Sequence, residues 1–257
     1  MKHCSRLAIV ILTVSLLWLI VFNACSGPIP VSETKAAIID QLCVLLPNQA
    51  FIEQATLELE EYGFSVDVYS DETVTVDLYR KLPAYGYKLI IFRVHSGLLG
   101  VDPKVINRTW LYTNEPYSKT SHLIEQLDDQ VTYAKTHEDA PWCFAISAEF
   151  IKNSVEGQFN DTAIIMMGCD ALHFEDMAEA FIQKGASTYI AWDASVILYY
   201  VDSTTPTIIE KLCSDESTIE EAVAQTMADK GTDPKYNSIL KYYPRQCASK
   251  TLSQLIK

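Results

Sequence analysis

From Lys35 onward, short apolar runs alternate with longer amphipathic segments along the chain. Such alternation is typical of βαβ units, in which parallel strands form a buried sheet and helices cover its faces. The runs 88–94 and 162–167 are of the nearly continuous apolar type that is buried on both faces. We therefore predict an α/β fold with a mostly parallel sheet of about five or six strands. The predicted strands are Ala36–Leu42, Ser65–Tyr69, Lys88–Val94, Trp142–Ser147, Thr162–Met167 and Ser187–Trp192.

Capping residues predict where the helices begin and end. Asn48 is a suitable N-cap for a helix that continues through Glu61, and Gly63 provides its C-terminal stop. Asp202, close to two threonines, is interpreted as a local cap or turn. The segment 102–140 is either a flap over a cleft or a hairpin. Further helices are predicted at Val74–Leu82 (ended by Pro83), Ala148–Ser154, Asp176–Lys184 (closed by Gly185), Ile197–Leu212 and Ile219–Ala228.

The first 25 residues are set apart from the fold, because Lys2 and Arg6 precede an apolar run from Leu7 to Phe22. About 20 such residues suffice to span a bilayer, so the run is a signal peptide or an anchor helix. Residues 22–25 (FNAC) resemble a bacterial lipoprotein box, in which the cysteine is acylated. We predict lipid attachment at Cys25, with an uncleaved anchor or simple secretion as the alternatives.

Each of these alternatives places the folded part of the chain outside the cytoplasm, and the first two hold it at the cell membrane. Residues 1–25 are then the signal peptide, 26–34 a short tether and 35–257 the domain.

The charge of the chain excludes one class of partner. With 33 acidic and 20 basic residues the formal net charge is −13, which repels phosphate backbones, and no basic patch interrupts it. We therefore expect no nucleic-acid partner.

Cysteines and histidines give no sign of a metal site, since neither kind shows metal-ligand spacing. We expect no metal and no cofactor. Five cysteines follow the leader, an odd number, so at least one is a free thiol or pairs with another chain. Cys213 and Cys247 are either bridged or buried as small apolar side chains. The five are Cys43, Cys143, Cys169, Cys213 and Cys247.

Chemically capable residues follow two of the predicted buried strands. His95 follows one strand and Cys169 follows another, and the carboxyl ends of parallel strands share one edge of a sheet. A cysteine hydrolase needs this pair, because an adjacent imidazole keeps the thiolate ionised and later protonates the leaving amine. Gly97 and Gly168 allow the backbone to approach a substrate carbonyl. The N–H groups of Gly97 and Cys169 are the predicted oxyanion donors.

An apolar strand that ends near His and Gly, and a later one that ends in Gly-Cys, resemble the clan CD cysteine peptidases. The stretch from Ala163 to Val201 is similar to the gingipain and CHAT region of that clan, and the resemblance extends over Lys35–Asp229. It implies a caspase-like three-layer sandwich with His95 as the general base, Cys169 as the nucleophile and Gly97 as an oxyanion donor. The family has His followed directly by Gly, whereas Ser96 intervenes here.

Other candidate residues lie near this edge. Trp192 and Asp193 end the following strand and are predicted to shape the pocket for the residue before the scissile bond, where a carboxylate favours Lys or Arg. The alternative is that Trp192 is core and Asp193 caps the next helix. His173 is the nearest rival base. His122, His137 and His173 are all interpreted as solvent-facing.

Two hypotheses about function follow. The first is an extracytoplasmic, membrane-tethered cysteine endopeptidase with a Cys/His dyad, acting on a peptide or protein substrate. The second is an inactive caspase-like lipoprotein domain that binds a peptide or partner protein. The presence of both dyad residue types favours the first, and Ser96 favours the second.

Overall fold

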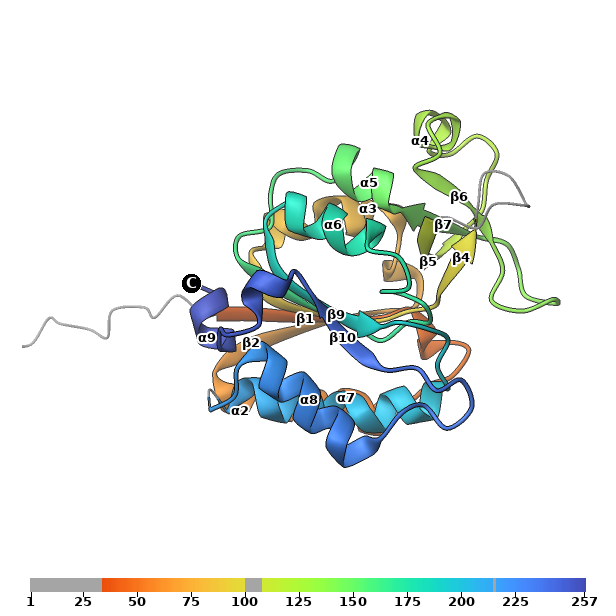
Figure 1. Ribbon diagram of the computed structural model, residues 1–257. Helices are drawn as coiled ribbons and strands as arrows, with labels where there is room; N and C mark the ends of the chain where they lie inside the picture. The colour runs from red at the N-terminus through yellow and green to blue at the C-terminus, as the bar shows by residue number, and fades with distance from the viewer. Residues whose placement is uncertain (1–33, 100–107, 215) are drawn as a thin grey trace, which may run out of the picture. The chain divides into compact units, whose positions relative to one another are not determined.

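A six-stranded sheet forms the middle layer of the structure (Figure 1). The computed structural model describes residues 34–99, 108–214 and 216–257. Cys25 and the predicted leader lie outside the described residues, as does most of the predicted tether, so the lipid attachment stays a prediction. Thr34–Lys257 form one compact unit. Within the described ranges, no helix has both the length and the apolar character that crossing a bilayer requires.

The strand order in the sheet is β10-β9-β8-β3-β1-β2. All neighbouring strands are parallel except β10, which runs antiparallel to β9 at one edge. The predicted α/β fold with a mostly parallel sheet is therefore confirmed. The strands are β1 Thr34–Asp40, β2 Phe64–Ser70, β3 Tyr87–Arg93, β8 Thr162–Met166, β9 Ala186–Trp192 and β10 Leu240–Tyr243.

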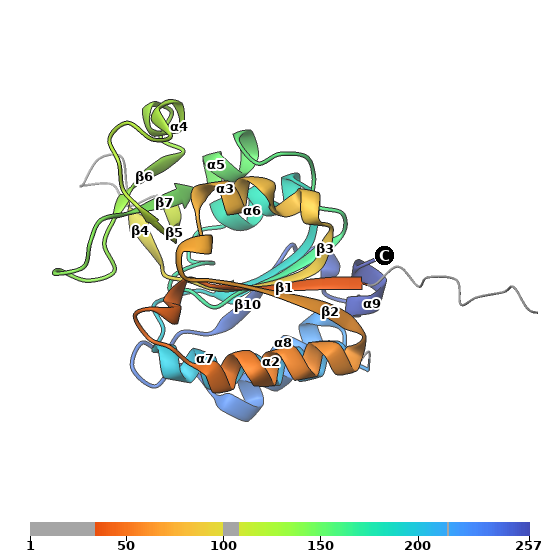
Figure 2. The same cartoon turned by 180° about the vertical axis from the view of Figure 1, so that it is seen from behind.

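Helices cover both faces of the sheet and complete three layers (Figures 1 and 2). One face carries α2 Gln49–Tyr62, α7 Leu198–Cys213 and α8 Ile219–Lys230, and the other carries α3 Val76–Lys81, α5 Ala148–Asn153 and α6 Asp176–Gln183. Short helical segments are η1 Gln41–Cys43, η2 Asp71–Thr73, η3 Leu82–Tyr85, η4 Arg245–Cys247 and α9 Leu252–Leu255.

Alternation of side chains along each strand creates two cores. Successive residues of a strand point to opposite faces, so Ile39 of β1 packs in the core with Phe181 of α6, and Ile38 packs in the core with Leu59 of α2. All four side chains are fully buried. Each buried aliphatic or aromatic side chain stabilises the fold by about 1.5–3 kcal/mol.

The predicted ends of α2 are confirmed. The Asn48 side chain accepts a hydrogen bond from Phe51 N at 3.1 Å, as an N-cap does. Gly63 follows the helix with φ 109°, a left-handed conformation that glycine adopts without steric cost.

A second sheet stands beyond the carboxyl ends of the parallel strands (Figure 1). Its strand order is β4-β5-β7-β6, and each pair is antiparallel. The predicted strand near 142–147 belongs to this sheet rather than to the central one, and the segment 102–140 contributes β5 and β6. The elements are β4 Ser96–Leu99, β5 Arg108–Pro116, α4 Leu123–Leu127, β6 Val131–Ala134 and β7 Cys143–Ser147.

Several sequence interpretations were wrong. Asp202 is not a cap or turn, because it lies within α7 and is buried. Asp193 does not cap that helix, since α7 begins at Leu198. His122 does not simply face solvent, because its Nε2 lies 2.7 Å from Glu115 Oε1.

The cysteines of the described residues carry no disulfide. No disulfide joins Cys213 to Cys247, so the bridged alternative was wrong, and Cys247 is buried. Strand β10 was not predicted from the sequence.

Candidate functional site

His95 and Cys169 follow neighbouring strands. Strand β3 pairs in parallel with β8, so the two residues leave the same edge of the sheet side by side. The sequence prediction that their strands share this edge is therefore confirmed. Both residues are half-buried.

Ser96, the residue that departs from the family pattern, links the two loops. Its Oγ donates a hydrogen bond of 2.5 Å to the backbone carbonyl of Cys169. The side chain fits because Gly168 has no Cβ: a Cβ there would lie 2.8 Å from Val94 O and would also collide with Ser96 Oγ. Ser96 therefore holds the histidine loop against the cysteine loop.

The backbone of His95 is fixed by two further residues. Its N–H donates to Gln41 Oε1 at 2.9 Å, and its carbonyl accepts from Tyr112 N at 2.9 Å. The ring of Tyr112 lies beside the imidazole, with 5.8 Å between the ring centroids. The Gln41 side chain also donates to Asn114 Oδ1 at 2.9 Å, so the hydrogen bonds that hold His95 reach β5 of the second sheet.

The imidazole of His95 is held in its neutral form. Burial lowers the pKa of His95 to about 4, and the charge of His137 adds to this effect. The buried Nε2 has no hydrogen-bond partner among the described residues. A buried ring nitrogen without a partner costs free energy, and it is free to exchange a proton with a bound group.

The thiol of Cys169 is also neutral at rest. Its sulfur lies 3.4 Å from Val196 N and 3.5 Å from Val196 O. Burial raises the pKa of the Cys169 thiol; the Val196 N–H opposes this, while the charges of Asp170 and Asp233 add to it.

Both pKa shifts therefore favour a neutral thiol and a neutral imidazole at neutral pH, rather than the expected thiolate–imidazolium pair. No hydrogen bond joins the imidazole to the thiol among the described residues. Attack by the sulfur requires His95 to take the thiol proton as a substrate binds, which is general-base catalysis rather than a stored ion pair.

The predicted oxyanion donors differ in their surroundings. Gly97 lies in β4 opposite Trp110 of β5. The Cys169 N–H donates to no backbone carbonyl of the described residues and is directed at its own sulfur, where it lowers the thiol pKa slightly. Both oxyanion roles stay predictions.

The two predicted specificity residues are differently placed. Trp192 is 2% exposed and packs edge-on against Tyr200 in the core. Asp193 is near the surface, where its carboxylate lies 2.9 Å from Lys241 Nζ and accepts a hydrogen bond from Ile239 N. Their part in substrate binding stays a prediction. His173, the rival base, is exposed, and its Nδ1 lies 3.2 Å from the Asp193 carbonyl.

A buried ionic cluster supports the carboxyl edge. Arg93, at the end of β3, is fully buried and makes two hydrogen bonds of 2.8 Å to Asp202 and one of 2.7 Å to Asp40. The Asn48 side chain completes the cluster with a bond of 2.8 Å to Asp202. The cluster joins the ends of β1 and β3 to the start of α2 and to α7, and Arg93 lies two residues before His95 in the chain.

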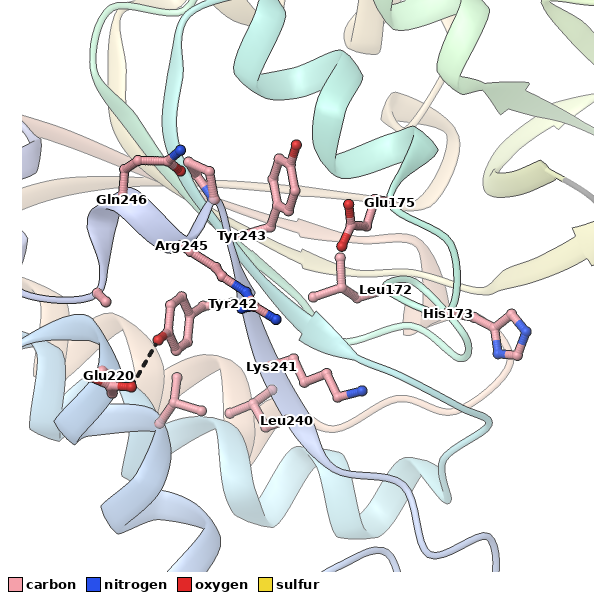
Figure 3. Close-up of a pocket in the computed structure, with 13 residues that line it drawn as sticks. Leu172, His173, Glu175, Glu220, Leu240, Lys241, Tyr242, Tyr243, Arg245 and Gln246 are labelled. Atoms are coloured by element: carbon pink, nitrogen blue, oxygen red, sulfur yellow. Dashed lines mark hydrogen bonds between the residues drawn. The ribbon is translucent and has the colours of Figure 1, made fainter.

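A cavity of about 850 Å³ lies beside the edge strand β10 (Figure 3). It is lined by His173 and Glu175 after the cysteine loop and by Lys241, Tyr242 and Arg245 of the β10 region. Neither His95 nor Cys169 lines it. Its size alone does not make it the reaction site.

The described residues were compared with the side-chain groupings that bind metal ions. No group of three or more His, Cys, Asp or Glu there is arranged to hold a metal ion.

Comparison with known proteins shows a distant structural likeness. No family model and no curated protein matches the sequence. The crystal structure of the Arg-specific cysteine proteinase gingipain R is similar, with a TM-score of 0.45 and 14% identity over 86% of this chain. The chain spans 45% of the length of that protein. A likeness this remote assigns no activity to this chain.

Proposed function

We propose that this chain is a cysteine endopeptidase, with Cys169 as the nucleophile and His95 as the general base. The observation that supports it is the placement of both residues just after adjacent parallel strands, with Ser96 bonded across the two loops. A membrane tether at Cys25, outside the cytoplasm, is part of the same proposal.

The reaction proceeds through an acyl-enzyme. As Cys169 Sγ attacks the peptide carbonyl carbon, its proton passes to His95 and a tetrahedral oxyanion forms. The C–N bond then breaks, and His95 returns the proton to the leaving amine. Water attacks the thioester in the second half, His95 takes its proton, and the carboxylic acid product leaves as the thiol is restored.

Because His95 and Cys169 are both neutral at rest, substrate binding must promote the proton transfer between them. A bound peptide excludes water from the half-buried pair and supplies the carbonyl that accepts the developing negative charge. The Cys169 N–H makes no hydrogen bond to a backbone carbonyl of the described residues, and in this proposal it donates to that charge.

A peptide-library digest tests the proposal. Wild type is compared with Cys169→Ala and His95→Ala, and both variants should lose at least about 1,000-fold in kcat/KM. Matched controls are Cys213→Ala, a second half-buried thiol, and His173→Ala, the rival base near the site. Cleavage that survives Cys169→Ala, or that is lost equally in His173→Ala, contradicts the assignment.

One observation favours a second candidate, a domain of the same fold that binds a peptide without cleaving it. Burial raises the pKa of the Cys169 thiol, and no hydrogen bond joins it to His95 among the described residues. Saturable peptide binding by the wild type with no cleavage product would select this candidate.

A further inference from the structure

An apolar groove of about 580 Å³ opens between the segment that follows β1 and the segment that precedes β7. One wall carries Val44 and Leu45, which are 72% and 41% exposed. The other carries Pro141 and Trp142, and Trp142 is 47% exposed. Large apolar side chains gathered in one solvent-open hollow mark a binding surface.

The groove lies where the topology favours a ligand. From β1 the chain adds β2 on one side of the sheet and then β3 on the other, so the direction of winding reverses between β1 and β3. In open parallel sheets, ligands bind at the carboxyl ends of the strands at this switch point. Val44 and Leu45 follow β1, and His95 follows β3.

The groove is continuous with the surroundings of His95. Gln41 lines it, and the Oε1 of the same side chain accepts the hydrogen bond from His95 N. Asn114 lines it as well and pairs with Gln41. His137 lines the far wall, and its charge acts on the His95 imidazole.

Strand order fixes the side of His95 on which the groove lies. Along the edge, β8, β3 and β1 succeed one another, so the residues they deliver are Cys169, then His95, then the groove wall. The groove is therefore on the far side of His95 from the nucleophile. In peptide hydrolysis the imidazole stands next to the leaving amine, because it protonates that nitrogen.

We propose that this groove binds the leaving-group side of the substrate, and that it selects a bulky apolar side chain immediately after the scissile bond. This inference rests on the proposed peptidase function and names its specificity. Exposed carboxylates of Asp71 and Glu72 line the same groove. They favour a Lys or Arg as the next residue of the substrate.

Binding is tested without turnover in the Cys169→Ala protein. The probes are the amides of the dipeptides Leu-Lys and Gly-Lys, each with a free α-amine like that of a leaving product, followed by fluorescence of the exposed Trp142 or by NMR. Leu-Lys should bind roughly 10- to 100-fold more tightly than Gly-Lys. Val44→Ser with Leu45→Ser should bring the ratio close to one, whereas Leu57→Ser, an exposed leucine of α2, should leave it unchanged.

Cleavage is tested with peptides that differ only in the residue after the scissile bond. Wild type should prefer Leu or Phe to Gly by roughly 10-fold or more in kcat/KM, and the groove variant should lose this preference. Equal binding of the two dipeptides, or a preference that survives in the groove variant, overturns the groove assignment. Cysteine-dependent cleavage without the preference overturns it while the proposed function stands. Dipeptide binding with no cleavage by wild type means that the proposed function has failed, and the leaving-group role fails with it.

Discussion

Replacing Gly168 by alanine is expected to separate the two loops that carry the candidate dyad. The new methyl group would lie 2.8 Å from Val94 O and would overlap the Ser96 hydroxyl. The backbone of Gly168 is not in the left-handed region, so the cost comes from collision alone. Overpacking of this kind costs about 1–3 kcal/mol. For a domain of this size each kcal/mol lowers the melting temperature by roughly 2–4 °C.

The effect on activity should exceed the effect on stability. A displacement of about 1 Å between reacting groups can reduce the rate by about 100-fold. Ser96→Ala alone removes one hydrogen bond, worth about 1 kcal/mol. Combined with Gly168→Ala it also removes part of the collision, so the two substitutions should be less than additive by about 0.5 kcal/mol or more.

Thermal and urea unfolding of the four proteins in this cycle measures these quantities, with peptide cleavage measured in parallel. For the unfolding measurements, Gly97→Ala is the matched control, because its methyl group would meet only Tyr112 Oη at 3.7 Å, an ordinary contact. A Gly168→Ala protein that is as stable as wild type, or no more affected than Gly97→Ala, would refute the account of how the loops are held together.

Three further predictions concern the thiol, a specificity residue and the membrane anchor. Burial raises the pKa of Cys169 and lowers that of His95 to about 4, so iodoacetamide should label Cys169 slowly at pH 6. The labelling rate should rise about tenfold for each pH unit until the pH reaches the thiol pKa. Fast labelling at pH 6 that falls in His95→Ala would contradict the neutral resting state. If Asp193 selects a basic residue before the scissile bond, Asp193→Asn should lower the preference for Lys or Arg at that position. Lys241→Met, which removes the cation now paired with Asp193, should raise the same preference. A peptide-library profile that is unchanged in both variants rejects this role. Cys25→Ser should leave a longer, unprocessed chain that lacks the lipid, and equal mass of mutant and wild type would reject lipidation there.

Elements whose signals are local could be predicted from the sequence. The apolar run of β3 is buried on both faces, and Asn48 and Gly63 end α2 as expected, because strand burial and helix capping depend on residues close together in the chain. Strand β10 escaped prediction. It is only four residues long, lies at the sheet edge and owes its pairing to β9, about fifty residues earlier.

Contacts between distant residues account for what was missed in the site. Asp202 lies in a helix with two threonines, which resembles a cap locally, yet it pairs with Arg93 from another layer. Ser96 looked like a departure that weakens the catalytic pattern, whereas its hydroxyl bonds to the cysteine loop. Gln41 of η1 and Tyr112 of β5 hold His95 from other elements, and no local pattern marks either residue.

In the proposed reaction, Cys169 forms a covalent acyl intermediate with a peptide substrate and His95 moves the proton. Mass spectrometry of an acid-quenched digest, carried out with wild type and His95→Ala, tests this most directly. We expect a thioester adduct on the peptide that contains Cys169, formed at least about 1,000-fold more slowly in His95→Ala. Cleavage products that accumulate without any adduct on Cys169, or an adduct whose rate is the same in His95→Ala, would contradict it.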